Sequence, residues 1–410
     1  MRGNGRGNAK NEVPETTPEL AVGADAFVDR GAGLEVAVVG AGAVGVTAAY
    51  DLASEGADVT LYEKGQVASG SSGRAAGVCY NAFADDLDAE IGAAAIERFR
   101  SLSSDDTFPF VECPYVWLAR QGDERRAAHI REGIEAMQSR GVVALEVGSD
   151  ELAERFPNLR TDDVAVAGIA GAAGYTDPAR YTACLAAAAS GAGASIETDT
   201  PVEVRVDPPR VVPEGEGTER EFDAVLVAAG GHTKAILEAA GLPIAMKPYR
   251  VQAMTATGDL PEPMCYDATN GFYARPHPDG LLAGNGTEER EIDPDDYERG
   301  ANPGFADELC ERVAHRFPEA ELDGAKTTRA WAGVCTATPD GDPLVGERHD
   351  GLYVATGFQG HGFMRAPDIG ARIADEILGG EGIDAFDPTR FSGTELFDVV
   401  EGMTIEDEPR

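Results

Sequence analysis

The clearest pattern of hydrophobic positions lies between residues 34 and 63, and it predicts two strands with a helix between them. Residues 34–39 are almost continuously apolar and rich in valine, as in a strand that is buried on both faces. The alanine-rich residues 43–52 predict a helix, and residues 57–63 predict a second strand that ends on an acid. This order of elements is that of a βαβ unit with parallel strands.

Three glycines stand between the first strand and the helix, in the spacing Gly40-x-Gly42-x-x-Gly45. Gly40 permits a tight turn, Gly42 lets a pyrophosphate approach the backbone, and Gly45 lets the helix pack close to the sheet. The N–H groups at the helix start, at Ala43 and Val44, suit an anion because the helix dipole is positive there. The turn therefore predicts dinucleotide binding, with a glycine-rich structural turn as the alternative.

The acid at the end of the second strand supports the same prediction. Glu63 lies 23 residues after the first glycine, where its carboxylate would accept hydrogen bonds from ribose hydroxyls. Its charge argues against a 2′-phosphate at that position. The small-residue loop 69–77, which contains Arg74, is either a second wall for the pyrophosphate or a flexible connection.

The middle of the chain predicts helices first and strands afterwards. Helical periodicity covers residues 85–105 and 123–140, with a strand expected at 111–119 between them and a short helix at 150–156. Further elements follow in order: a helix that begins at Asp177-Pro178 and ends near Ser190, strands at 195–198 and 202–206, a hairpin loop at 207–221, and a buried parallel strand at 222–231.

The last third predicts a second sheet and a second anion site. Residues 246–257 and 271–285 look like strands of a more antiparallel sheet, with a turn at 277–280, and the acidic residues 286–323 read as mostly helical. A strand at 351–357 runs into the glycine loop 357–364, and a helix is expected from Ala366-Pro367 to Leu378. A strand, a glycine loop and a helix N-terminus form a ready anion site.

The charge of the chain is strongly negative. The 72 acids against 34 bases give a formal net charge of −38, and only five bases are lysine. The acids are spread along the whole chain, which favours a solvated surface adapted to concentrated salt over a docking surface for a basic partner. Clustered Lys and Arg are missing, so nucleic-acid binding is not expected.

The cysteine spacing and the apolar content of the chain indicate in which compartment the protein is expected. The six cysteines are widely spaced without a Cys-x-x-Cys pair, so we expect reduced thiols in the cytoplasm, no disulfide framework and no metal site. No run of 18 apolar residues is present, so no membrane span is expected. Residues 1–30 lack the apolar core of a signal peptide and read as a disordered tail.

Taken together, these motifs resemble the FAD-dependent D-amino-acid oxidase superfamily, in the branch of glycine oxidase, sarcosine oxidase and D-amino-acid dehydrogenases. The resemblance covers residues 34–385. Besides the glycine turn it is carried by the following segments: Gly70 to Gly77, Tyr175-Thr-Asp-Pro178, Ala228-Ala-Gly230, Tyr273-x-Arg275-Pro276 with Asp279-Gly280, Trp331-Ala-Gly333 with Pro339-Asp-Gly341, and Gly357 to Phe363.

The resemblance implies an α/β fold with a discontinuous Rossmann-type FAD-binding domain and a second α+β substrate domain that carries a mostly antiparallel sheet. The expected FAD-binding segments are 31–80, 165–240 and 325–385; the expected substrate-domain segments are 81–164 and 241–324, and 386–410 forms a C-terminal tail. The N–H groups of the loop 357–364 would lie against the N1/C2 edge of the flavin, and the backbone at Val202 would meet the adenine.

The motifs and the resemblance together predict a set of cofactor-binding residues. They are Gly40, Gly42, Ala43, Val44, Gly45, Glu63, Lys64, Ser71, Ser72, Arg74, Ala75, Gly77, Val202, Ala229, Gly230, Gly333, Gly357, Gly360, His361, Gly362 and Met364.

This sequence departs from the family pattern at three places. Cys335 stands where glycine-oxidase-like members carry an arginine for the substrate carboxylate, and Met364, followed by Arg365, stands where monomeric sarcosine oxidases carry a lysine. No lysine lies between Tyr273 and Arg275, the region of a lysine linked to oxygen reactivity in those relatives.

A carboxylate substrate therefore needs another anchor. Arg74, Arg275 and Arg329 are candidates, with Arg275 preferred because arginine offers a bidentate fit, although each of them could instead form a surface ion pair. His361 is either a catalytic residue beside the flavin or a loop histidine satisfied by backbone, and Tyr273 lines the substrate pocket or belongs to the core. Arg275, His361 and Tyr273 are thus the candidate catalytic residues.

The resulting functional hypothesis is an FAD-dependent oxidoreductase that takes a hydride from the Cα–H of a small amino or N-methyl amino acid. The alternatives are a 2-hydroxy-acid or glycerol-phosphate dehydrogenase, and a redox-silent FAD-binding subunit of a larger complex. We expect noncovalent FAD, with a link to Cys335 as the alternative, and a dehydrogenase that passes electrons to a carrier and reacts slowly with oxygen.

Overall fold

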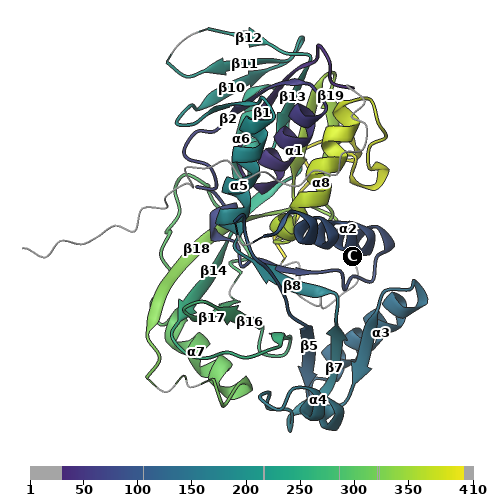
Figure 1. The fold of residues 1–410 in the computed structure, drawn as a ribbon, viewed down its shortest axis with the longest axis vertical. Coiled ribbons are helices and arrows are strands. Elements are labelled where there is room, and N and C mark those ends of the chain that lie inside the picture. Colours follow the sequence, from purple (N-terminus) through teal and green to yellow (C-terminus); the bar gives the residue numbers. More distant parts are fainter. Residues whose placement is uncertain are drawn as a thin grey trace, which may run out of the picture.

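The computed structural model describes residues 30–104, 106–215, 218–285, 287–320, 322 and 324–400. Figure 1 shows two main parts, a sheet covered by helices in its upper half and a larger curved sheet in its lower half. The expected tail at residues 1–30 lies outside the described residues except for Arg30. Within the described residues, no helix is both long and apolar enough to cross a membrane.

The upper sheet is the predicted Rossmann-type layer. Its strands are parallel except for the antiparallel pair at one edge, β19 with β20. Their spatial order is β19 (Leu344–His349), β20 (Leu352–Thr356), β13 (Ala224–Val227), β1 (Glu35–Val39), β2 (Asp58–Tyr62) and β9 (Ser195–Glu197).

Both faces of this sheet are covered, as the continuous apolar strand pattern predicts. Val36 and Val38 of β1 pack on a helical layer of α1 (Ala43–Ser54), α5 (Pro178–Gly191) and α8 (Gly362–Ile377). Ala37 and Val39 point to the other face, which holds α6 (Thr233–Ala239) and the small sheet of β10 (Val202–Arg205), β11 (Arg210–Pro213) and β12 (Arg220–Glu221).

The lower sheet is the predicted mostly antiparallel one, since only β15 and β5 run parallel. Its order is β18 (Thr327–Ala337), β14 (Lys247–Ala256), β17 (Gly280–Asn285), β16 (Phe272–His277), β15 (Met264–Asp267), β5 (Tyr115–Arg120), β7 (Val164–Ala170) and β6 (Ala144–Val147). The helices that cover it are α3 (Glu124–Ser139), α4 (Ser149–Arg155) and α7 (Phe305–Arg316).

A third, small sheet lies between the two parts. It consists of β3 (Val78–Tyr80), β8 (Ala173–Thr176) and β4 (Phe110–Glu112). Thus the expected single strand 111–119 is wrong, because the chain breaks at Cys113-Pro114 and β4 and β5 join different sheets. Proline lacks the N–H that a continuing ladder needs.

The prediction of a mostly helical stretch at 286–323 is also wrong. Of the described residues in that stretch, only Phe305–Arg316 form a helix. Residues 287–304 contain two prolines and two glycines, and they follow an irregular path from the lower sheet. Helix α8 differs as well, because it begins at Gly362 and includes Pro367, whereas Pro367 was expected near its first residue.

Three segments pack with a different part of the structure from the one expected. Helix α2 (Asp86–Leu102), expected in the substrate domain, packs against α8 of the upper layer. Strand β18, expected in the FAD-binding domain, is an edge strand of the lower sheet. The expected C-terminal tail folds back as far as it is described, because Val399 is buried beside Tyr249.

Candidate active site

A cavity of about 950 Å³ lies between the two main sheets. One wall comes from the ends of β1, β2, β13 and β20, and the other from β14 and β18. We name its two ends by the upper strands: the β2 end is next to Glu63, and the β20 end is next to the loop from Phe358 to Met364. Strands β2 and β20 are three strand spacings apart, about 14 Å.

The glycine turn at the β2 end has the geometry that its spacing predicts. Gly40 has a φ of +111°, and a Cβ there would lie 2.5 Å from the Ala228 carbonyl oxygen. A Cβ at Gly45 would lie 2.0 Å from the Gly40 carbonyl oxygen, so this glycine serves packing and does not line the cavity. Gly42 does line it, and the nearest atom to a Cβ there is Ser72 Oγ at 3.2 Å.

Glu63 ties the backbone of this end together. Its carboxylate accepts hydrogen bonds from the Ala41 N–H at 2.9 Å and from the Gly65 N–H at 2.8 Å. The same side chain lines the cavity, as does Val202 nearby. Because the carboxylate has further lone pairs, it can also accept from ribose hydroxyls.

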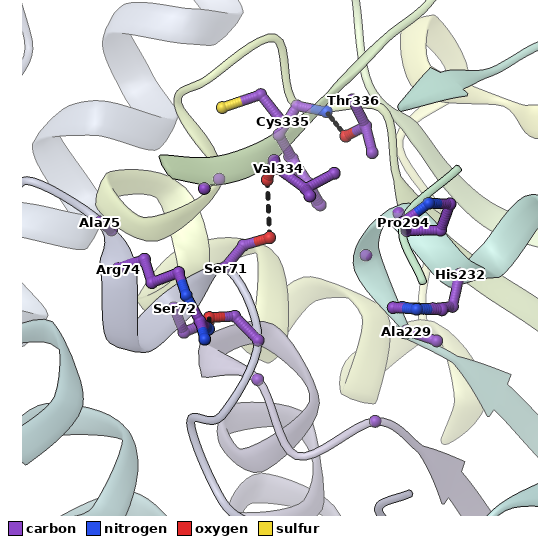
Figure 2. A pocket seen from close by; sticks show the side chains of 18 of the residues that line it. Ser71, Ser72, Arg74, Ala75, Ala229, His232, Pro294, Val334, Cys335 and Thr336 are labelled. Atoms are coloured by element: carbon purple, nitrogen blue, oxygen red, sulfur yellow. Dashed lines mark hydrogen bonds between the residues drawn. The ribbon is translucent and has the colours of Figure 1, made fainter. Parts of the chain in front are cut away.

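The loop 69–77 joins the two walls. The Ser71 hydroxyl donates to the Val334 carbonyl at 2.6 Å, a bond drawn in Figure 2. Ser72 Oγ accepts from the Ala43 N–H at 2.9 Å, and the Trp331 indole N–H donates to the Arg74 carbonyl at 3.0 Å. The Arg74 guanidinium donates to carbonyls of its own loop, at Ser69 and, at 2.7 Å, Gly70. The loop is thereby held in place as a wall of the cavity.

The β20 end has the second helix N-terminus that the sequence predicts. Strand β20 leads into the glycine loop, and His361 is the N-cap residue of α8. Gly360 has a φ of +84°, and a Cβ there would lie 3.8 Å from the Tyr249 hydroxyl and 3.9 Å from the Cys335 sulfur. A positive helix end next to open space suits developing negative charge.

His361 at this helix end is neutral. Its Nε2 lies 3.2 Å from the Tyr80 hydroxyl. Burial, aided by the nearby Arg365 guanidinium, lowers the pKa of His361 to about 3, and burial raises the pKa of Tyr80 to about 12. Both side chains therefore act as uncharged hydrogen-bonding groups near neutral pH.

Most of the predicted site residues meet at this cavity. Its lining includes Gly40, Gly42, Ala43, Val44, Glu63, Lys64, Ser71, Ser72, Arg74, Ala75, Gly77, Val202, Ala229, Gly230, Tyr273, Gly333, Gly360, His361, Gly362 and Met364. Gly45 and Gly357 lie behind it; Gly357 has a φ of +78°, and a Cβ there would lie 2.4 Å from Thr338 Cγ2.

Arg275, the preferred carboxylate anchor, does not line the cavity. Its guanidinium donates to the Ala76 carbonyl at 2.6 Å and to the Pro276 carbonyl at 2.7 Å, and it lies over the Tyr175 ring. Arg329 also lies outside the lining, over the Trp331 ring. Two carbonyls and an aromatic face occupy Arg275, so we do not carry it forward as a substrate anchor.

The sequence did not reveal a row of aromatic rings beside the β20 end. Tyr80 and Tyr115 are stacked with ring centroids 4.4 Å apart, the Phe83 centroid lies 5.3 Å from that of Tyr80, and the Trp117 centroid lies 5.8 Å from that of Tyr115. Tyr80 and Tyr115 both line the cavity. Tyr115 and Trp117 are two residues apart on β5, but Tyr80 and Phe83 come from a separate segment, so no local pattern brings the four rings together.

The comparisons with known proteins agree with this geometry. Residues 35–376 match the family described as FAD dependent oxidoreductase. The chain belongs to this family. It is therefore an FAD-dependent oxidoreductase, and the resemblance to the D-amino-acid oxidase superfamily is confirmed.

Individual relatives are similar over most of this chain. Glycine oxidase of Geobacillus kaustophilus is 27% identical over 88% of this chain and 96% of its own length. Human mitochondrial dimethylglycine dehydrogenase is 28% identical over 87% of this chain but only 44% of its own. The solved structure of L-proline dehydrogenase from P. horikoshii has a TM-score of 0.78 at 28% identity, over 88% of this chain and 99% of that one.

The residues of the cavity fit FAD. The β2 end offers a glycine turn and an acid for the adenosine half, and the β20 end offers a helix N-terminus some 14 Å away for the flavin. Gly42 and Gly360 keep both places open, since side chains there would enter the cavity. Among the described residues, no group of three or more His, Cys, Asp and Glu side chains could hold a metal ion.

Proposed function

We propose that this enzyme oxidises the carbon–nitrogen bond of a small amino acid or N-methyl amino acid. Relatives named for glycine and dimethylglycine, and a similar structure named for L-proline, support this substrate class. When FAD is bound, it supplies the acceptor for the hydride that leaves the substrate Cα. The chain itself must hold the amine uncharged, orient the Cα–H bond and bind the rest of the substrate.

The lack of a carboxylate among the described lining residues of the β20 end is the observation that carries this proposal. The acids in the described lining are Glu63, Glu203, Glu214 and Asp295. Glu63 directly follows β2. Glu203 and Glu214 are placed near it because the Thr200 N–H donates to the Glu63 carbonyl and the Glu214 N–H to the Pro201 carbonyl. Asp295 accepts a hydrogen bond from Lys64, the residue after Glu63. They belong to the β2 end.

A wall without a carboxylate favours the free-amine form of the substrate. Burial beside neutral His361 and tyrosine hydroxyls disfavours an ammonium ion, because no carboxylate is there to stabilise it. Only the free amine has the lone pair that assists loss of the Cα hydride. The site thus promotes the reactive form of an amine without a strong general base.

Tyrosine hydroxyls are the proposed partners of the substrate carboxylate. Tyr249 and Tyr273 line the cavity from β14 and β16, and Tyr249 lies close to Cys335, the position at which related enzymes carry an arginine. Phenol groups donate to a carboxylate and stay uncharged. In this proposal Tyr273 binds the substrate, and His361 positions the Tyr80 side chain beside the flavin edge.

In the experiment, candidate substrates are mixed with the enzyme without oxygen, and reduction of the flavin is monitored by its absorbance. We expect bleaching by at least one of glycine, N,N-dimethylglycine and L-proline, with lactate and glycerol 3-phosphate inert. Bleaching by the hydroxyl compounds alone would overturn the substrate class, and no bleaching by any compound would favour a redox-silent subunit. In the Tyr273→Phe variant, KM for the active amino acid should rise about tenfold, the cost of one lost hydrogen bond to a charged group.

We also propose that the protein works in the cytoplasm of a cell with high internal salt. None of the six cysteines forms a disulfide, and burial raises the pKa of the Cys265 thiol to about 12 and of the Cys113 thiol to about 11, so both remain protonated. Cysteines without disulfides and an evenly acidic sequence suit a reducing, saline interior.

A further inference from the structure

Residues 287–304, here called the 287–304 segment, leave the lower sheet, contact the upper layer and return to the lower sheet. At its start the segment stays beside β14, since the Glu288 N–H donates to the Arg250 carbonyl and the Ile292 N–H to the Pro248 carbonyl, both at 2.9 Å. At its end the Ala332 N–H of β18 donates to the Arg299 carbonyl at 2.9 Å. Both ends therefore belong to the lower sheet.

A buried arginine fixes these ends. Arg250 is 2% exposed. Its guanidinium donates to the Glu298 carbonyl at 2.9 Å, to the Gly300 carbonyl at 2.6 Å and to the Glu288 carboxylate. Charge-assisted bonds in a buried place are strong, so the two ends move together with the sheet.

The middle of the segment is attached to the opposite wall by exposed charges. Lys64 Nζ lies 2.6 Å from the Asp295 carboxylate and 2.7 Å from His232 Nε2. Lys234 of α6 pairs with Glu291. The Lys64 and Asp295 side chains are 47% and 66% exposed, which marks a pair that opens easily.

The middle of the segment also covers the cavity. Pro294 and Asp295 line it, and Figure 2 shows Pro294 beside His232 and Ala229. Pro294 Cβ lies only 3.4 Å from where a Cβ on Gly231 would stand, so this glycine lets the segment come close. The segment thus closes the β2 end, where the glycine turn receives the dinucleotide.

The closed position of the acidic segment depends on its ion pairs with Lys64 and Lys234. The 287–304 segment has seven acids and two arginines, and Glu203 and Glu214 line the same cavity. The FAD diphosphate adds further negative charge. The whole chain has five lysines, and two of them pair with this segment. The attraction of Lys64 for Asp295 and of Lys234 for Glu291 therefore holds the segment against the opposite wall.

We propose that the 287–304 segment is a flap over the adenosine end of FAD, and that its ion pairs with Lys64 and Lys234 decide how fast FAD enters and leaves. This inference rests on the FAD dependence of the family and not on the substrate class. Exposed ion pairs contribute up to about 1 kcal/mol each, too little to hold the fold but enough to change a local opening equilibrium. The two pairs together correspond to a change of about 5- to 30-fold.

The test measures FAD release from the purified holoenzyme, by the rise in flavin fluorescence after dilution. Glu291→Gln breaks one pair at a residue outside the cavity lining, and Asp295→Asn with Glu291→Gln breaks both. We expect release to be a few-fold faster in the single variant and 5- to 30-fold faster in the double variant. The double variant should keep its melting temperature as FAD-saturated protein.

The matched control is Glu219→Gln. It also removes one negative charge and breaks exposed ion pairs, those with Arg205 and Arg210 on the small sheet β10–β12. FAD release from this variant should equal that of the wild type. Unchanged release in the double variant, or an equal acceleration in Glu219→Gln, would overturn the flap.

Salt provides a second readout. Concentrated KCl weakens attraction between opposite charges, so FAD release from the wild type should accelerate with salt. The double variant has already lost the pairs, so its release should respond little. If wild type and double variant show the same salt response, the lysine pairs do not control release.

Discussion

His361 Nε2 and the Tyr80 hydroxyl lie 3.2 Å apart, which connects the first residue before α8 to strand β3. The two residues are 281 positions apart in the sequence. The contact sets the chemistry of the β20 end, because both groups are buried and uncharged. A proton on the imidazole would be stabilised neither by Tyr80 nor by the neighbouring Arg365 guanidinium.

The depressed pKa of His361 predicts acid sensitivity. The group titrates near 6.5 in the unfolded chain and near 3 in the folded one, so below pH 6.5 the unfolded state binds the extra proton. The free energy of unfolding should therefore decrease as the pH is lowered from about 6.5 to 3, by up to about 1.4 kcal/mol per pH unit. Glutamine at this position does not titrate and still hydrogen-bonds Tyr80.

The measurement is urea unfolding of wild type and His361→Gln at several pH values. The difference between the two free energies should shrink or change sign in favour of the variant as the pH falls toward 4. Parallel pH profiles would mean that His361 is not held neutral by its surroundings.

Gly42→Val should abolish FAD binding while the protein still folds. A side chain there would meet Ser72 Oγ at 3.2 Å and then enter the pyrophosphate space, which is local crowding. Gly45→Val is the contrasting variant, because its Cβ would lie 2.0 Å from the Gly40 carbonyl oxygen, and it should lose about 3 kcal/mol of stability or more. Flavin content and circular dichroism separate the outcomes; a yellow Gly42→Val protein would contradict the assignment of this turn.

Thermal stability should rise with salt. The chain has a net charge of −38, so its acidic side chains repel one another. At 1 M salt the Debye length is about 3 Å, and repulsion between exposed charges that are farther apart is largely screened. A melting series from dilute buffer to molar KCl should show a steadily rising midpoint. A flat or falling series would remove the support for adaptation to concentrated salt.

Reduced flavin should pass electrons to a carrier faster than to oxygen. A cation beside the flavin speeds oxygen reduction by stabilising superoxide, but the β16–β17 hairpin carries no lysine, Arg275 is not among the residues that line the cavity, and His361 is neutral. After reduction by substrate, reoxidation in air-saturated buffer should be at least about tenfold slower than with an artificial dye. Equal rates would identify an oxidase.

FAD should be released by acid. Cys335 lines the cavity near Gly360, and we keep noncovalent FAD as the expectation, with a link to Cys335 as the alternative. Flavin should appear in the supernatant after acid precipitation, from wild type and Cys335→Ser alike. Flavin retained by the wild-type pellet alone would show a covalent link to Cys335.

The sequence by itself determined the local parts of this protein. The apolar strand β1, the glycine turn and helix α1 follow from contacts within about 30 residues, so their pattern predicts them directly. The same holds for the glycine loop before α8. Turn chemistry and helix starts are short-range, and they predicted most of the glycines and polar residues that line the cavity.

Only the tertiary structure decided which groups meet across the cavity. Arg275 looked like an anchor, but the packing of β16 on the loop 69–77 commits its guanidinium to the Ala76 carbonyl. The acidic stretch after β17 looked helical, but Arg250, Lys64 and Lys234 hold it as an irregular flap. Such outcomes depend on partners far along the chain, whose position no local pattern records.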